Sequence, residues 1–116
     1  MKKGDIVLIP FPFTNLVEQK IRPALILVNN QESLNIIVAF ITTNLTLNNK
    51  YDLFLSPNLE NRLKKESIIK INKLATIDKT LIIALLGNIN VKEIIELDKK
   101  LIELFKIQTF FKKDYE

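Results

Sequence analysis

The chain of 116 residues contains no cysteine and no histidine. Without cysteine, both a disulfide-stapled fold and a zinc site built on thiolates are excluded. Without histidine, the chain lacks the side chain that most often acts as general base, binds metal or activates a hydroxyl nucleophile. Any catalysis must therefore use arginine, lysine, carboxylate or hydroxyl groups.

Glycine and long apolar runs are also scarce. The only glycines, Gly4 and Gly87, are too far apart to form a phosphate-binding glycine loop. The longest apolar runs, 36–41 and 81–86, hold six residues each, whereas a membrane-spanning helix needs about 20. An early acid and two prolines interrupt the region where a signal peptide would need its apolar core. We expect a soluble protein of the cytoplasm that does not associate with membranes.

The charged residues are unevenly chosen. The net charge is +4, and the 17 basic residues comprise 15 lysines but only two arginines, Arg22 and Arg62. Arginine offers a planar fork of donors that matches a phosphate, which lysine lacks. Each of the two arginines is therefore a candidate for binding a phosphate. The 13 acids are scattered along the sequence, and we expect neither a metal site nor a cofactor.

The hydrophobic pattern predicts a mainly β fold with a C-terminal helix, of the α+β class. Short β-rich runs are separated by turn residues about every ten positions, as in a small barrel or sandwich. Asn90, with Glu93 three places on, has the spacing of a capping box before a helical apolar repeat. We expect one domain over 1–116, with a barrel over 4–89 and a helix over about 91–109. The predicted strands span 5–9, 24–28, 35–42, 51–55, 67–71 and 81–86.

Two polar residues stand at the ends of neighbouring predicted strands. Arg22 precedes the run 24–28, and Thr42 closes the run 35–42. If these runs form an antiparallel hairpin, Arg22 and Thr42 are neighbours at one rim of the sheet. Taken alone the signal is weak, because threonine is a common strand former and arginine a common surface residue.

Six segments resemble the MazF/PemK-type toxins, in the same order and at the same spacing. They are Gly4–Thr14 (GDIVLIPFPFT), Ile21–Leu27 (IRPALIL), Val38–Thr43 (VAFITT), Ser67–Ile71 (SIIKI), Leu74–Lys79 (LATIDK) and Leu86–Ile89 (LGNI). The resemblance covers residues 4 to about 105. It implies a small SH3-like β-barrel of the MazF/PemK/CcdB toxin type, acting as a homodimer and as the toxin of a type II toxin–antitoxin pair.

The resemblance also implies an activity, that of an mRNA interferase. This is a sequence-specific, metal-independent endoribonuclease that cleaves single-stranded mRNA and is held in check by a cognate antitoxin. The catalytic pair of the family carries over to Arg22 and Thr42. The lack of histidine fits this chemistry, because the 2′-hydroxyl of RNA can itself attack the phosphorus and leave a 2′,3′-cyclic phosphate.

The residues expected to contact RNA follow from the same resemblance. Arg62 stands where relatives often carry Gly-Leu, and it is a surface or phosphate-binding residue rather than a catalytic one in this interpretation. The expected RNA contacts are Phe13, Thr14, Asn15, Glu18, Gln19, Lys20, Thr43 and Lys73.

Two other functions stay open at this point. A related toxin class on the same barrel poisons DNA gyrase by binding, through a C-terminal helix with terminal aromatic residues, and this chain ends with Phe110, Phe111 and Tyr115. A gyrase poison does not need the Arg22–Thr42 pair. A non-catalytic barrel that binds RNA or protein is the second alternative, because catalysis depends on fine placement of its groups.

Overall fold

The computed structural model describes residues 1–11, 20–46 and 48–108, and these form a β-sheet with one C-terminal α-helix. The predicted mainly β fold with a C-terminal helix is thereby confirmed. The strands in the described ranges are β1 (Asp5–Phe11), β2 (Lys20–Asn29), β3 (Asn35–Thr42), β4 (Asp52–Leu55), β5 (Ser67–Asp78) and β6 (Ala84–Asn88); a 3₁₀ turn spans Lys79–Leu81 and helix α1 spans Val91–Phe105. Within these ranges, no helix is long and apolar enough to cross a membrane.

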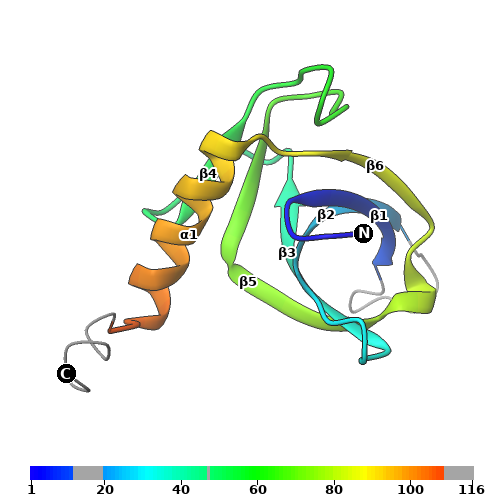
Figure 1. Cartoon of the computed structure of the whole chain (residues 1–116). Helices are drawn as coiled ribbons and strands as arrows, with labels where there is room; N and C mark the ends of the chain where they lie inside the picture. The colour runs from blue at the N-terminus through cyan, green and yellow to red at the C-terminus, as the bar shows by residue number, and fades with distance from the viewer. Residues whose placement is uncertain (12–19, 47, 109–116) are drawn as a thin grey trace.

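The six strands form one antiparallel sheet in the order β4-β5-β3-β2-β1-β6. The sheet curls into a half-barrel, and α1 lies along its outside near β4 and β5 (Figure 1). The strong curl of β5 coincides with a bulge, since Ala39 faces Leu74 but its neighbour Phe40 faces Lys70. The predicted hairpin of β2 and β3 is present, and these two strands occupy the middle of the sheet.

Alternate residues of the central strands supply two separate apolar clusters, as the period of two in a strand requires. The first cluster includes Leu25, Ala39 and Ile41, and it packs against α1 through the fully buried Leu97. The second cluster includes Ala24 and Val38, and Phe40 packs against it from β3. Burial of each large aliphatic side chain contributes about 1.5–3 kcal/mol. Since α1 packs against the first cluster and Phe40 packs against the second, the face of β2 and β3 that carries Phe40 points away from α1.

The helix begins at its predicted cap. Asn90 Oδ1 accepts the Glu93 N–H at 2.8 Å, and Glu93 Oε1 accepts the Asn90 N–H at 2.9 Å, which completes the capping box. The helix ends at Phe105, four residues before the predicted end, because Lys106 adopts a left-handed conformation (φ 53°) and bonds back to Glu103 and Ile102.

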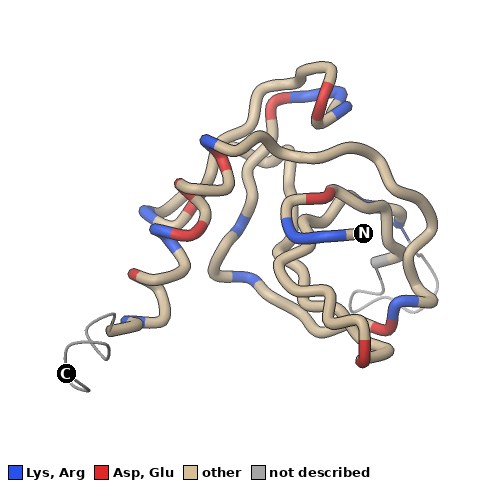
Figure 2. Tube along the Cα trace, viewed as in Figure 1, with Lys and Arg blue, Asp and Glu red and all other residues tan. Residues whose placement is uncertain are grey.

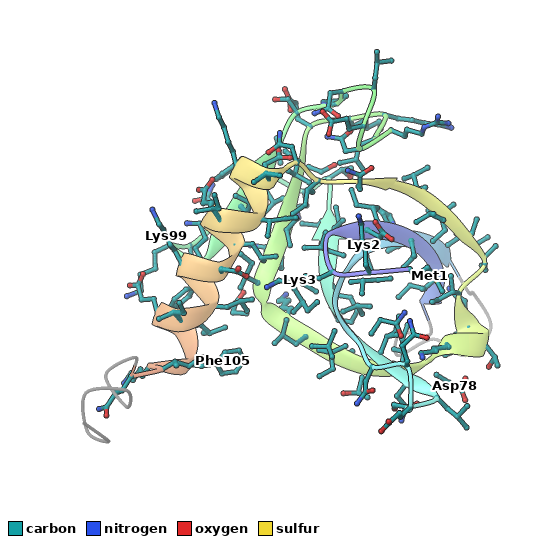
Figure 3. The ribbon with its side chains drawn as sticks, in the orientation of Figure 1. Met1, Lys2, Lys3, Asp78, Lys99 and Phe105 are labelled. Carbon is teal, nitrogen blue, oxygen red and sulfur yellow. The ribbon has the colours of Figure 1, made fainter. Side chains whose placement is uncertain are left out.

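The last predicted strand begins later than the apolar run suggests. Asp78 caps a 3₁₀ turn with its carboxylate, which accepts the N–H and the hydroxyl of Thr80 at 2.8 Å each. The 3₁₀ turn includes Leu81, the first residue of the apolar run 81–86, and β6 starts only at Ala84. Asp78, which is labelled in Figure 3, pairs with Asn35 at the start of β3, whereas Thr42 is the last residue of that strand.

Candidate functional site

Arg22 and Thr42 lie at the same end of the neighbouring strands β2 and β3. The register pairs Ala24 with Phe40, and continuing it by two residues along both strands brings Arg22 opposite Thr42. Both residues are half-buried, and both lie on the face that carries Phe40, away from α1. The structure thus brings together the two residues predicted to be neighbours at one rim.

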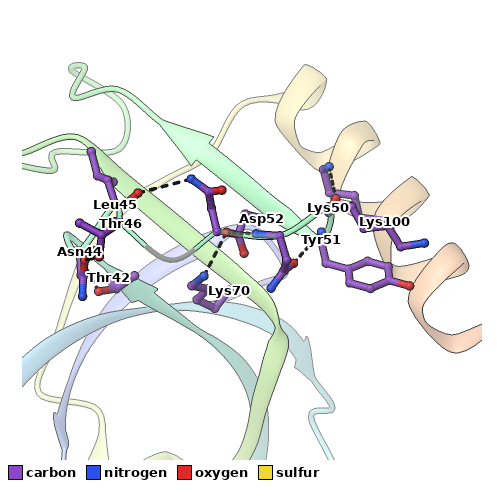
Figure 4. A network of polar contacts seen from close by, with 11 residues as sticks. Thr42, Asn44, Leu45, Thr46, Lys50, Tyr51, Asp52, Lys70 and Lys100 are labelled. Carbon is purple, nitrogen blue, oxygen red and sulfur yellow. Dashed lines mark hydrogen bonds and ion pairs between the residues drawn. The ribbon is translucent and has the colours of Figure 1, made fainter.

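The hydroxyl of Thr42 is oriented by the chain that follows it. Thr42 Oγ1 accepts the Asn44 N–H at 3.0 Å, and Asn44 Oδ1 accepts the N–H and hydroxyl of Thr46 at 3.1 and 2.6 Å (Figure 4). Such turns arise because short polar side chains bond the backbone two residues on. Since the oxygen of Thr42 accepts this bond, its own proton can be donated to a ligand.

A buried ion pair lies at the start of β4, where the chain that follows Thr42 re-enters the sheet. Lys70 Nζ donates to Asp52 Oδ2 at 3.0 Å, and the same oxygen accepts the Asn49 N–H at 2.9 Å (Figure 4). Lys70 is the cross-strand partner of both Phe40 and Asp52. It therefore lies diagonally across from Thr42 on the same face of the sheet.

The segment between Thr42 and Asp52 is also tied to α1. Lys100 Nζ donates to the carbonyl oxygen of Lys50 at 3.0 Å, and Lys50 Nζ lies 3.0 Å from Glu103 Oε1. The hydrogen bond and the charge of Glu103 raise the pKa of the exposed Lys50. Contacts with β5 and α1 thus fix residues 49–52, which lead into β4.

The sequence alone does not predict the ion pair between Asp52 and Lys70. A lysine in a β-rich run such as Ser67–Ile71 normally marks a solvent-facing position. The available signal is the position itself, because Lys70 stands between the apolar residues Ile69 and Ile71, and Asp52 is the second residue of the preceding predicted strand. Only the pairing of β4 with β5 joins the two charges.

The remaining predicted RNA contacts divide into three groups. Lys20 and Thr43 are exposed and lie close in sequence to Arg22 and Thr42. Lys73 is exposed in the bulge of β5, beside the step from Ala39 to Phe40, and thus two to three residues along β3 from Thr42. Phe13, Thr14, Asn15, Glu18 and Gln19 lie outside the described residues, as do the C-terminal aromatic residues Phe110, Phe111 and Tyr115.

Metal-binding side chains are not gathered at this rim. In the ranges that the structure describes, no group of three or more acidic residues is placed to hold a metal ion. On the face of Thr42, the register places Arg22 on β2, Lys70 on β5 and Asp52 on β4. The rim can therefore offer a guanidinium and a hydroxyl to an anionic ligand.

A curled antiparallel sheet with one C-terminal helix, and with polar residues gathered at one rim, defines a class of small half-barrel proteins. Within that class, the model of the PemK-like, MazF-like toxins of type II toxin–antitoxin systems matches residues 2–105. The chain belongs to this family and is a MazF/PemK toxin of a toxin–antitoxin system. The family predicted from six sequence segments is thereby confirmed.

Solved structures of low sequence identity share the fold. The toxin MazF-mt6 of Mycobacterium tuberculosis is 19% identical, with a TM-score of 0.74 over 90% of this chain and 99% of that chain. An endoribonuclease in complex with its cognate antitoxin from a mycobacterial species is 13% identical, with a TM-score of 0.72 over 94% and 98% of the two chains. MazF of Deinococcus radiodurans is 18% identical, with a TM-score of 0.72 over 92% and 97%. A search of curated proteins finds no significant match.

Proposed function

We propose that this toxin is a sequence-specific, metal-independent endoribonuclease that cleaves single-stranded mRNA, with Arg22 and Thr42 as its catalytic residues. The observation that carries the proposal is the register of the central hairpin, which, continued two residues past Ala24 and Phe40, brings Arg22 beside Thr42 at one rim. Membership of the MazF/PemK family and the likeness to structures named as endoribonucleases support it.

The proposed chemistry needs no nucleophile from the protein. The ribose 2′-oxygen attacks the adjacent phosphorus, the bond to the 5′-oxygen breaks, and the products carry a 2′,3′-cyclic phosphate and a 5′-hydroxyl. The enzyme has to hold the in-line geometry and stabilise the charge that develops on the phosphoryl oxygens. The fork of Arg22 suits both tasks, because two parallel N–H groups fit two oxygens of one phosphate.

Thr42 would supply a further hydrogen bond in the same site. Its hydroxyl oxygen is held by the Asn44 N–H, so the hydroxyl proton can reach a phosphoryl oxygen or orient the 2′-hydroxyl. Lys20 and Thr43, both exposed near this rim, would contact the flanking RNA. Phe13, Thr14, Asn15, Glu18, Gln19 and Lys73 remain proposed contacts from the resemblance.

The partners form part of the same proposal. We expect the whole chain to act as one toxin domain in a homodimer that a cognate antitoxin inhibits. Solved neighbours of the fold include a MazE–MazF complex from Deinococcus radiodurans and an endoribonuclease with its cognate antitoxin. The net charge of +4 favours an acidic antitoxin segment. Exposed apolar residues on β6 and α1, such as Leu85 and Val91, leave surface for such contacts.

The test is to incubate the purified toxin with a long single-stranded RNA in EDTA and to map the ends. Wild type, Arg22→Ala, Thr42→Ala and the control Lys92→Ala, an exposed helix position, are compared. We expect discrete cuts with cyclic-phosphate ends for wild type and Lys92→Ala, and none for the other two variants. Intact RNA with folded wild-type protein would reject the proposal and favour gyrase poisoning or simple binding.

A further inference from the structure

A second basic site lies at the same rim, on the face of the sheet that points toward α1. It is a pocket of about 480 Å³ with apolar walls from Leu8, Pro23 and Leu86 and with Arg62, Lys64 and Lys65 at its edge. Ligand pockets commonly have this size and combine apolar walls with a few polar groups.

The pocket adjoins the Arg22–Thr42 pair. Pro23, which follows Arg22, and Thr43, which follows Thr42, both line it. Because successive side chains of a strand point to opposite faces, Arg22 and Thr42 project from one face of the rim and the pocket opens on the other. A polynucleotide that crosses the rim can therefore reach both.

Arg62 adopts a backbone conformation that a glycine would adopt at lower cost. Its φ is 56°, in the left-handed region where a Cβ is unfavourable. The buried side chain of Asn61 imposes this turn, because its Oδ1 accepts the N–H groups of Asn58 and Leu63 at 3.0 Å each. One of the two arginines of a lysine-rich chain thus occupies a position that disfavours any side chain, which indicates that its guanidinium has a use.

The loop that carries Arg62 is fixed in place over the pocket. Asn61 Nδ2 donates to the Ser56 carbonyl at 2.9 Å, and the Asn88 N–H of β6 donates to the Glu60 carbonyl at 3.0 Å. Leu63 is buried in the core cluster that also contacts α1. Arg62, Lys64 and Lys65 therefore belong to a well-anchored loop. It is the uppermost loop in Figure 2.

The basic residues of this loop are available to an anion. Among the described residues, no carboxylate forms an ion pair with Arg62, Lys64 or Lys65. The adjacent acid Glu66 instead accepts the hydroxyl of Ser56 at 3.0 Å. Neither Glu66 nor another acid of the described chain lines the pocket.

We propose that this pocket binds a nucleotide of the RNA strand next to the cleaved phosphate, with Arg62 on a phosphodiester and the base against Leu8, Pro23 and Leu86. The inference rests on the proposed function, because it assumes that RNA crosses the rim at Arg22. The phosphodiester matches the guanidinium fork, and lysines strengthen the binding of a polyanion without reading its sequence. The apolar walls would receive the flat base.

The decisive variant is Arg62→Gly, because it removes the guanidinium and relieves the backbone at the same time. Lys106→Gly is the matched control, since Lys106 is the other non-glycine residue with positive φ in the described chain (φ 53°) and lies at the end of α1. Both changes remove one positive charge at a left-handed position. We expect both variants to unfold at a denaturant midpoint equal to or above that of wild type.

RNA binding is measured by fluorescence anisotropy with a short single-stranded RNA whose mapped cleavage site carries a 2′-deoxyribose and cannot be cut. Arg62→Gly should weaken binding about tenfold and reduce the slope of log K against log salt by about 0.7, as for one lost phosphate contact. Lys106→Gly should stay within about twofold of wild type. In cleavage assays, Arg62→Gly should raise KM with little change in kcat, because Arg62 would bind substrate without touching the reacting phosphate.

Three results would overturn the inference. Equal RNA affinity of Arg62→Gly and Lys106→Gly, while wild type cleaves RNA, would reject the pocket and leave the proposed function intact. Wild-type protein that neither binds nor cleaves RNA would reject the proposed function and the pocket with it. If Arg62→Gly loses binding to an acidic antitoxin-like peptide but keeps its RNA affinity, the pocket would be assigned to a protein partner instead.

Discussion

Lys70 Nζ lies 3.0 Å from Asp52 Oδ2, and the two side chains are 11% and 0% exposed. The pair joins β5 to β4, and through the Asn49 N–H it also holds the segment that begins at Thr42. It is a buried ion pair on the face that carries the proposed catalytic residues.

Removal of one partner of this pair should destabilise the toxin strongly. Lys70→Met leaves the Asp52 carboxylate buried without its cation, which typically costs about 3–5 kcal/mol in the free energy of unfolding. The double variant Lys70→Met/Asp52→Leu replaces both charges with apolar groups and should be about as stable as wild type. Urea unfolding curves of the three proteins check this, and equal midpoints for Lys70→Met and wild type would contradict it.

The fork of Arg22 should matter more than its charge. Arg22→Lys keeps the positive charge but loses the paired donors, and we expect cleavage to fall about 10²- to 10³-fold, or ~3–4 kcal/mol of transition-state stabilisation. Single-turnover rates with excess enzyme measure this directly. Thr42→Ser, which keeps the hydroxyl, should retain most activity, whereas comparable losses in Thr42→Ser and Thr42→Ala would argue against the hydroxyl as the working group.

A side chain at Gly87 should displace the loop that carries Arg62. A Cβ at this position would lie 2.3 Å from the Glu60 carbonyl oxygen and 2.7 Å from that of Asn61. Gly87→Ala should therefore lower the free energy of unfolding by about 1–3 kcal/mol. Ala84→Ser, an exposed change on the same strand, serves as the control, and chemical denaturation of both variants decides the matter.

The carboxyl of Asp78 should have a pKa below its ordinary value. The backbone N–H of Thr80, and secondarily its hydroxyl, hold the pKa of Asp78 below the ordinary value of 3.8. The folded-state pKa is the lower one, so the stabilisation is complete above pH 3.8 and is lost as pH falls through the folded value. NMR titration should show a partial return toward the ordinary pKa in Thr80→Ala, because the larger cause, the backbone N–H, remains.

The sequence is sufficient for those features that depend on local order. The capping box of Asn90 and Glu93 needs only neighbouring residues, and the central hairpin needs only two apolar runs and the turn between them. The proximity of Arg22 and Thr42 therefore follows from the order of residues in one hairpin. The full extent of β5 does not, because the bulge at 71–73 interrupts the alternation that marks a strand.

Features that join distant segments cannot be predicted in the same way. Lys70 contacts Asp52 because β4 pairs with β5. The chain order does not predict this pairing, because β3 directly precedes β4 in the chain but lies on the other side of β5 in the sheet. The pocket under Arg62 requires the loop after β4 to settle on β6 beside Gly87. Neither contact leaves a periodic signal in the sequence, because each arises from the order of strands in the curled sheet.

The central position of β2 and β3 has a consequence for how this toxin is controlled. Two strands lie on each side of the pair, and Arg22 pairs with Ile9 of β1 while Thr42 pairs with Ile68 of β5, so neighbouring strands hold the backbone at both positions. We therefore expect inhibition to come from a partner that covers the rim, and release of that partner to expose a site that is already assembled.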